Sequence, residues 1–80
     1  MIKAKYTIKG VIYDFNKMIA NVEHSENKYS LRRVNGRWYF YSTFFNKWMS
    51  EVHTELVEEA YKEWLIDYTI HKEILGGEHG

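Results

Sequence analysis

Histidine and acidic residues supply most of the catalytic and metal-binding chemistry available to this chain, because cysteine is absent. The four histidines are isolated, since none lies three or four residues from another, and no HExxH motif occurs. The GxSxG, P-loop and GxGxxG motifs, which position a nucleophile or phosphates, are also missing. We therefore expect no catalytic residue, no metal site and no cofactor, and hence a protein that is not an enzyme.

Charge divides the chain into two parts of opposite sign. Residues 1–49 hold nine of the eleven Lys and Arg residues and three acids, a net charge of +6. Residues 50–80 hold the other two cations and eight acids, a net charge of −6. Such asymmetry in a neutral chain favours binding to a charged partner or self-association. Head-to-tail association is one form of homo-oligomer that fits, although closed symmetry is commoner.

The acidic part has the period of an amphipathic helix. Apolar residues recur at steps of four from Val52 to Tyr68, and Gly76-Gly77 supplies a stop, which predicts a helix from 51 or 55 to 75. A row of acids with the same step lies along one edge of this helix: Glu51, Glu55, Glu59 and Glu63. A row of carboxylates is similar to a phosphate backbone and predicts docking to a basic site on a protein partner. A solvated helix face is the alternative.

The segment from Phe44 to Met49 carries a second candidate for protein binding. Its pattern is ambiguous between the end of a strand and a turn, so we treat it as a connection. Trp48 is the residue here most suited to an interface, because Trp is enriched at hot spots. An exposed aromatic patch and packing against the start of the helix are both consistent with the sequence, and packing is the favoured interpretation.

The basic part has the period of β-strands. Residues 2–9 alternate between apolar and polar types, and Gly10 predicts a bulge or bend before this first strand ends near residues 14–17. A second strand is expected at 19–24. Residues 28–34 and 37–43 flank Asn35-Gly36, the dipeptide most typical of a type I′ hairpin. The prediction is an α+β fold in which an antiparallel β-meander of three to four strands packs on one C-terminal helix.

The two-residue loop of this hairpin sets its register, with Arg33 opposite Trp38 and Arg32 opposite Tyr39. Leu31, Trp38 and Phe40 then share the face that the helix covers. The opposite face combines cations with phenol rings, which predicts single-stranded RNA or DNA binding as the alternative function. Its predicted residues are Lys28, Arg32, Arg37, Tyr39 and Tyr41, joined by Lys3, Lys5 and Lys9 of the first strand. A plain solvated strand surface is the competing interpretation.

Length and composition place the chain among small folded domains. Its 80 residues suffice for one core, and 45% hydrophobic and 18% aromatic residues are far above the content of disordered chains. We expect a single domain over 1–77, a frayed tail over 78–80 and no internal repeat. No membrane-spanning run or leader pattern is present, so we expect a soluble cytoplasmic protein and no membrane partner.

No motif identifies a family. In architecture alone, a small meander with a terminal helix resembles phage or mobile-element accessory proteins that bind and inhibit a host factor. This resemblance implies no site residue. The leading expectation is a binding module that docks a protein partner as an inhibitor or regulator, and the alternative is a nucleic-acid binder.

Overall fold

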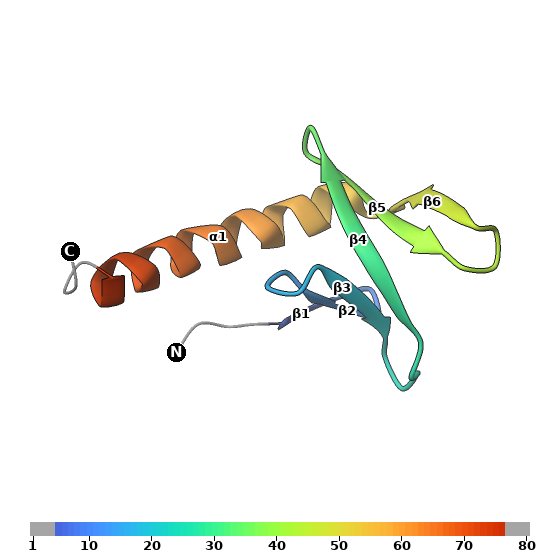
Figure 1. Cartoon of the computed structure of the whole chain (residues 1–80), viewed down its shortest axis with the longest axis horizontal. Coiled ribbons are helices and arrows are strands. Elements are labelled where there is room, and N and C mark those ends of the chain that lie inside the picture. Colours follow the sequence, from blue (N-terminus) through green and yellow to red (C-terminus); the bar gives the residue numbers. More distant parts are fainter. Residues whose placement is uncertain (1–4, 77–80) are drawn as a thin grey trace.

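The computed structural model describes residues 5–76, and side chains as far as residue 72. Six antiparallel strands follow in chain order as one meander: β1 (Lys5–Ile8), β2 (Val11–Asp14), β3 (Ile19–Val22), β4 (Lys28–Val34), β5 (Arg37–Ser42) and β6 (Lys47–Ser50). The helix α1 (Thr54–Gly76) follows β6 (Figure 1). The predicted α+β fold is confirmed, and the predicted number of strands is wrong. Lys3 and the predicted tail over 78–80 lie outside the described residues.

The first expected strand is a hairpin, not one bulged strand. Lys9 and Gly10 both have positive φ, 50° and 79°, so the chain reverses and β2 pairs back onto β1, with Ile8 opposite Val11. A two-residue turn with both residues in the left-handed region matches the twist of a β-hairpin. The reversal escaped sequence reasoning because lysine, unlike asparagine or aspartate, is an uncommon residue at positive φ.

The last strand comes from the segment interpreted as a connection. A four-residue loop over residues 43–46 joins β5 to β6, and the Ser42 hydroxyl accepts a hydrogen bond of 3.1 Å from the Phe45 N–H. Asn46 ends the loop with a φ of 53°. The strand β6 then pairs with β5, with Tyr41 opposite Trp48.

The two halves of the sheet have the same backbone plan. Each half is three strands joined by a two-residue turn and then a four-residue loop. In the first loop the Asp14 carboxylate accepts hydrogen bonds of 3.1 Å from the N–H groups of Asn16 and Lys17, and Met18 ends the loop with a φ of 55°. In the second loop, the Ser42 hydroxyl accepts the corresponding hydrogen bond and Asn46 has the corresponding positive φ. The repetition is one of backbone geometry, so a search for repeated residue types misses it.

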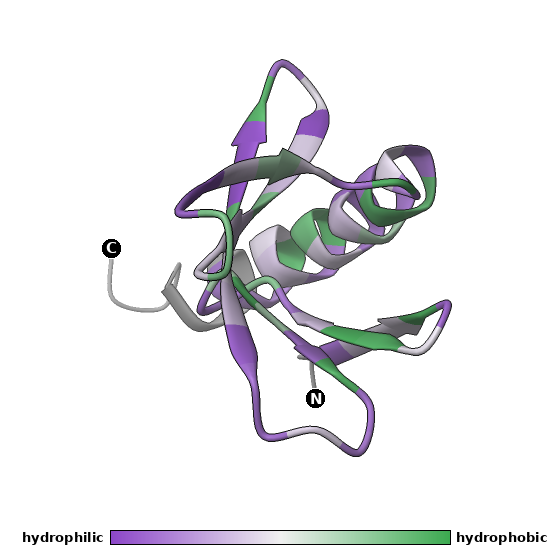
Figure 2. Cartoon of the chain, turned by 90° about the vertical axis from the view of Figure 1, so that its right-hand side faces the viewer, coloured by the Kyte–Doolittle hydropathy of each residue, from purple (hydrophilic) through white to green (hydrophobic). Residues whose placement is uncertain are grey.

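Aromatic rings form the core between the sheet and the helix. Figure 2 shows the strands curving, with α1 between the upper and lower parts of the sheet. Tyr13, Trp38 and Val57 are the most deeply buried large side chains. Phe15 makes a T-shaped contact with Tyr61 of the helix at 5.6 Å between ring centroids. The predicted core face of the Asn35-Gly36 hairpin and its register are confirmed.

A polar contact ties this hairpin to the helix. The Arg33 guanidinium donates two hydrogen bonds to the Glu58 carboxylate, 2.8 Å from Nε and 2.7 Å from Nη2. The buried Trp38 indole donates to the same carboxylate at 2.9 Å, and Arg33 also lies 5.0 Å from the centroid of the Tyr61 ring. These hydrogen bonds hold the pKa of Glu58 down to about 2, mainly through Arg33, against the opposing effect of burial. The β4–β5 hairpin therefore has a fixed position on α1.

Candidate binding surface

One surface collects three of the six cations and both phenol rings that sequence reasoning assigned to nucleic acid. We call it the outer face: the residues of β4, β5 and β6 that point away from α1, as strand alternation and the pairing register place them. Its members are Lys28, Ser30, Arg32, Val34, Arg37, Tyr39, Tyr41, Trp48 and Ser50. Three of them are cations and none is an acid, so the outer face is locally positive on a chain of zero net charge.

The centre of the outer face is a packed group of rings under an arginine. The Arg32 guanidinium lies 4.2 Å from the centroid of the Trp48 ring, which is a cation–π contact. Tyr41 meets the same ring edge to face, with centroids 5.4 Å apart, and Tyr39 pairs with Arg32 across the strands. Arg32 is exposed, and the three rings are half-buried. Packing holds the rings in place while one side of the group remains open to solvent.

Positive charge continues from the outer face toward β1. Lys5, Lys17 and Lys28 surround a shallow pocket of about 110 Å³, in which Asp14 is the one acid among the described lining residues. Lys5 therefore lies on the expected side of the sheet. Lys9 does not, because the reversal at Gly10 places it beside Glu59 and Glu63 of the helix, in an open groove between α1 and the β1–β2 hairpin. The prediction that Lys9 belongs to the basic surface is wrong for this reason.

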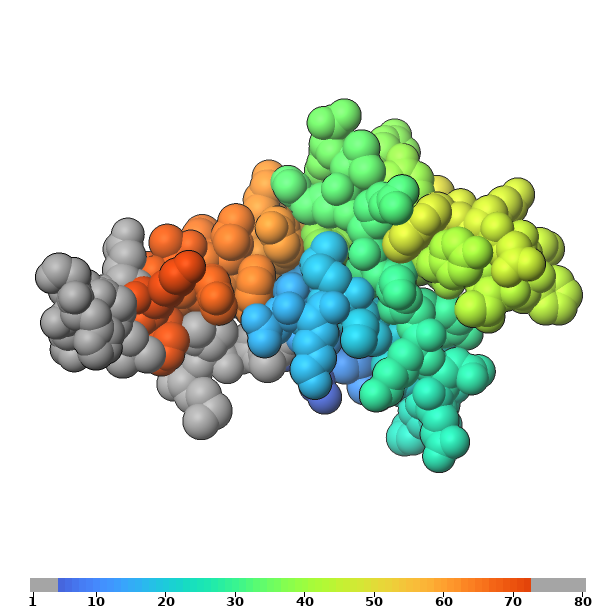
Figure 3. Space-filling model, in the orientation of Figure 1, coloured from blue at the N-terminus to red at the C-terminus, as the bar shows by residue number. Residues whose placement is uncertain are grey.

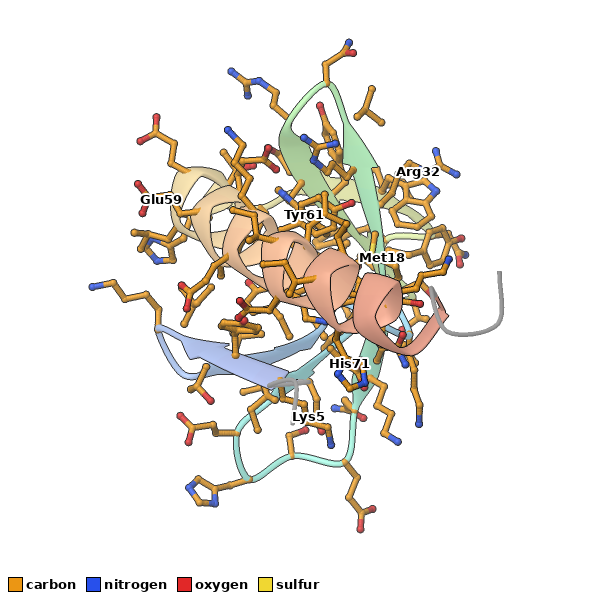
Figure 4. All side chains as sticks on the ribbon, turned by 90° about the vertical axis from the view of Figure 1, so that its left-hand side faces the viewer. Lys5, Met18, Arg32, Glu59, Tyr61 and His71 are labelled. Atoms are coloured by element: carbon orange, nitrogen blue, oxygen red, sulfur yellow. The ribbon has the colours of Figure 1, made fainter. Side chains whose placement is uncertain are left out.

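The residues predicted to bind a protein do not form one surface. Glu51 precedes α1 instead of starting it, and it faces the core side of the sheet, where it contacts Tyr13. Glu55, Glu59 and Glu63 are exposed on the helix, as predicted. Figure 4 shows Glu59 and Arg32 on opposite sides of the molecule, with Tyr61 between them. Trp48, the residue of the second predicted protein-binding segment, lies with Arg32 and is remote from this acidic row.

The loop between β5 and β6 exposes two phenylalanines. Phe44 is 87% exposed and Phe45 is 59% exposed, and their rings meet edge to face at 4.8 Å. The β5–β6 hairpin projects at one end of the molecule, opposite the far end of α1 (Figure 3). Trp48 and Met49 belong to opposite faces of β6, because successive strand residues alternate. The favoured prediction that this whole segment packs against the start of the helix is therefore wrong for the two phenylalanines.

No protein-family model, curated protein or solved structure matches this chain. Within residues 5–76, no helix has the length and apolar character needed to cross a membrane. Among the side chains of residues 5–72, no group of three or more His, Asp or Glu is placed to hold a metal ion. The geometry of the outer face is therefore the basis for assigning a function.

Proposed function

We propose that this protein is a non-enzymatic module that binds single-stranded nucleic acid through its outer face. The observation that carries the proposal is the group formed by Arg32, Tyr39, Tyr41 and Trp48, set among cations and free of acids. Trp48, which sequence reasoning did not assign to nucleic acid, adds aromatic area to this group.

The chemistry of single strands matches this group. Unpaired bases stack on aromatic rings and on guanidinium planes, and each stacked base contributes about 1–3 kcal/mol. Lys28, Arg32 and Arg37 supply charge for the phosphates that flank such bases. The base faces of a duplex are stacked inside it, so a duplex would contact the cations of the outer face but not its aromatic rings. We therefore expect single strands to bind more tightly than duplexes of the same length.

The distribution of charge also favours binding of a nucleic-acid strand at the outer face and not at α1. Acids are concentrated on α1, and Glu55, Glu59 and Glu63 repel a phosphate chain from that side of the molecule. A strand approaching from solvent is therefore directed to the outer face. Overall neutrality is compatible with binding because screening over about 8–10 Å makes the local charge, not the net charge, decisive.

Fluorescence anisotropy with labelled single-stranded and duplex RNA and DNA tests the proposal. If three cations neutralise three phosphates, the logarithm of the binding constant falls with the logarithm of salt concentration with a slope of roughly −2 for single strands. Arg32→Glu with Arg37→Glu should abolish binding. Trp48→Leu should weaken it by about tenfold and leave the salt slope almost unchanged, because stacking is not an ionic interaction.

A matched control separates the outer face from charge in general. Lys9→Glu with Lys72→Glu changes the net charge by the same amount at exposed positions outside the outer face. This control should retain binding to within about threefold, the effect of long-range charge alone. Absence of binding at low salt would refute the proposal. Equal loss in both double variants would also refute it, because binding would then depend on net charge and not on this surface.

Docking of a protein partner is the second candidate, and the exposure of Phe44 and Phe45 favours it. Two adjacent exposed rings on a projecting hairpin are typical of interface anchors, and the acidic edge at Glu55, Glu59 and Glu63 suits a basic partner. In this candidate the protein acts as an inhibitor or regulator of the partner. Phe44→Ser with Phe45→Ser, or Glu55→Lys with Glu59→Lys, should abolish capture of a partner and leave nucleic-acid binding intact. Retained capture in both variants would exclude these surfaces.

A further inference from the structure

A cleft on the core side of the sheet is left open beyond the area that the helix covers. Its walls come from four strands and from the residue that follows β6. The cleft has a volume of about 200 Å³ and is lined by Val11, Ala20, Val22, Tyr29, Phe40 and Glu51. For comparison, a protein cavity of about 150 Å³ is large enough to hold benzene. The cleft can therefore take one side chain or one small molecule.

The lining combines apolar walls with one negative charge. Tyr29 and Phe40 meet edge to face at 5.9 Å, and Val11 and Val22 complete the apolar surface. Glu51 alone carries a charge among the described residues that line the cleft. Within residues 5–72 no Lys or Arg forms an ion pair with it. A carboxylate without a counter-ion beside apolar walls is suited to a ligand that brings a positive charge on an aliphatic stem.

Contacts with two buried core residues, Tyr13 and Trp38, fix the position of Glu51. Its carboxylate interacts with the phenol of Tyr13, which is 1% exposed, and its backbone N–H donates a hydrogen bond of 2.9 Å to the Trp38 carbonyl. Burial, followed by the charge of Glu51 and the hydrogen bond with it, raises the pKa of Tyr13. Tyr13 therefore stays protonated and orients the carboxylate. A preorganised charge loses less entropy when a ligand arrives.

We propose that this cleft binds an alkylammonium group, with the aliphatic stem against Val11 and Val22, the cation paired to Glu51, and the rings of Tyr29 and Phe40 adding cation–π attraction. Two sources have this chemistry, a free alkylamine and a lysine side chain of a partner protein. The inference is independent of the proposed function, because the cleft and the outer face lie on opposite faces of the sheet.

Amide chemical shifts in two-dimensional NMR spectra measure this binding directly. The probes are n-butylammonium, its neutral counterpart n-butanol, and a pentapeptide with one central lysine among alanines, with or without acetylation of the lysine. Butylammonium should shift the amides of the six lining residues and bind at least about tenfold more tightly than butanol, the contribution of one partly shielded charge pair. Tighter binding of the lysine peptide than of butylammonium would identify a protein as the source, and the reverse order would identify a free amine.

Three substitutions complete the test. Glu51→Gln should weaken butylammonium binding by about tenfold, whereas Glu55→Gln, which removes the same charge from an exposed helix position, should change it by less than about twofold. Val22→Phe partly fills the cleft from a residue that is 42% exposed, so it should block binding without disturbing the core. Equal affinity for butanol and butylammonium would overturn the proposal. No shift at the lining residues, or full binding in Glu51→Gln, would also overturn it.

Discussion

The contact between Glu58, Arg33 and Trp38 yields the most quantitative prediction. Glu58→Ala removes the acceptor of the buried Trp38 indole N–H, and leaving that group unpaired costs about 1–3 kcal/mol. The lost ion pair costs roughly a further 0.5–1 kcal/mol, because the Arg33 side chain is 36% exposed and regains water. The expected loss in free energy of unfolding is therefore about 3 kcal/mol. Glu58→Gln keeps a carbonyl oxygen for Trp38 but removes the charge that pairs with Arg33, so it should lose about 1–2 kcal/mol.

The same carboxylate makes stability depend on pH in the acid range. Its pKa falls from an ordinary value of 4.5 to about 2 on folding, mainly through the hydrogen bonds from Arg33. A lowered folded-state pKa stabilises the fold fully above about pH 5, and this contribution is lost as the pH falls through 4.5 toward 2. The shift corresponds to at most about 3 kcal/mol, and exposure of Arg33 reduces it to about 2 kcal/mol. Glu58→Gln should not show this loss between pH 5 and 2.5.

Urea unfolding followed by tryptophan fluorescence at pH 7, 5 and 3 measures both effects. Glu59→Ala is the matched control, because the neighbouring Glu59 is exposed and should lose less than about 0.5 kcal/mol. The reasoning would be refuted if Glu58→Ala were no less stable than Glu59→Ala at pH 7. A wild-type acid dependence retained in Glu58→Gln would show that another carboxylate causes it.

Two further changes test the turns and the core. Gly36→Ala should lower the free energy of unfolding by about 1–2 kcal/mol and Tm by several degrees, because Gly36 has a φ of 81°. Steric overlap is not the cause, since the added Cβ would lie at an ordinary 3.6 Å from Glu58. An unchanged Tm in calorimetry would contradict this prediction. Stability should fall as the pH rises above 10, because the raised pKa of Tyr13 favours the fold only while its phenol is protonated. In chemical unfolding, Tyr13→Phe should lose less stability at alkaline pH than the wild type. An identical alkaline dependence in Tyr13→Phe would assign the effect to other groups, of which Tyr6 is one, because burial raises its pKa too.

Prediction from sequence succeeded where a few neighbouring residues decide the structure. Asn35-Gly36 adopts positive φ at both residues with little strain, so the turn, the register of β4 and β5 and the composition of both faces were predictable. The helix was predictable because its apolar stripe has the helical period over many residues. The turn at Lys9-Gly10 was not, because its sequence lacks the residue types that favour this geometry. The strand count was wrong for that reason and because the pattern of the segment that forms β6 is ambiguous between a strand and a turn.

The members of the proposed binding surfaces depend on contacts between distant parts of the chain. Trp48 could not be assigned to the outer face until the pairing of β6 with β5 set which of its residues point outward. Glu51 does not belong to the acidic row of the helix, because α1 begins three residues after it. Its carboxylate instead interacts with Tyr13 on the core side of the sheet. Arg33 and Glu58 are 25 residues apart, so no local pattern indicated their contact.

The sequence by itself determined the period of each element, the best hairpin, the separation of basic from acidic residues and the aromatic content of the core. These properties follow from local backbone preferences and from composition, which act over a few residues. Tertiary structure alone decided which charges and rings share a surface, because a shift of one residue in strand pairing moves every side chain to the other face. It also left the cleft beside Glu51 open, since the position of α1 decides how much of the curved sheet is covered.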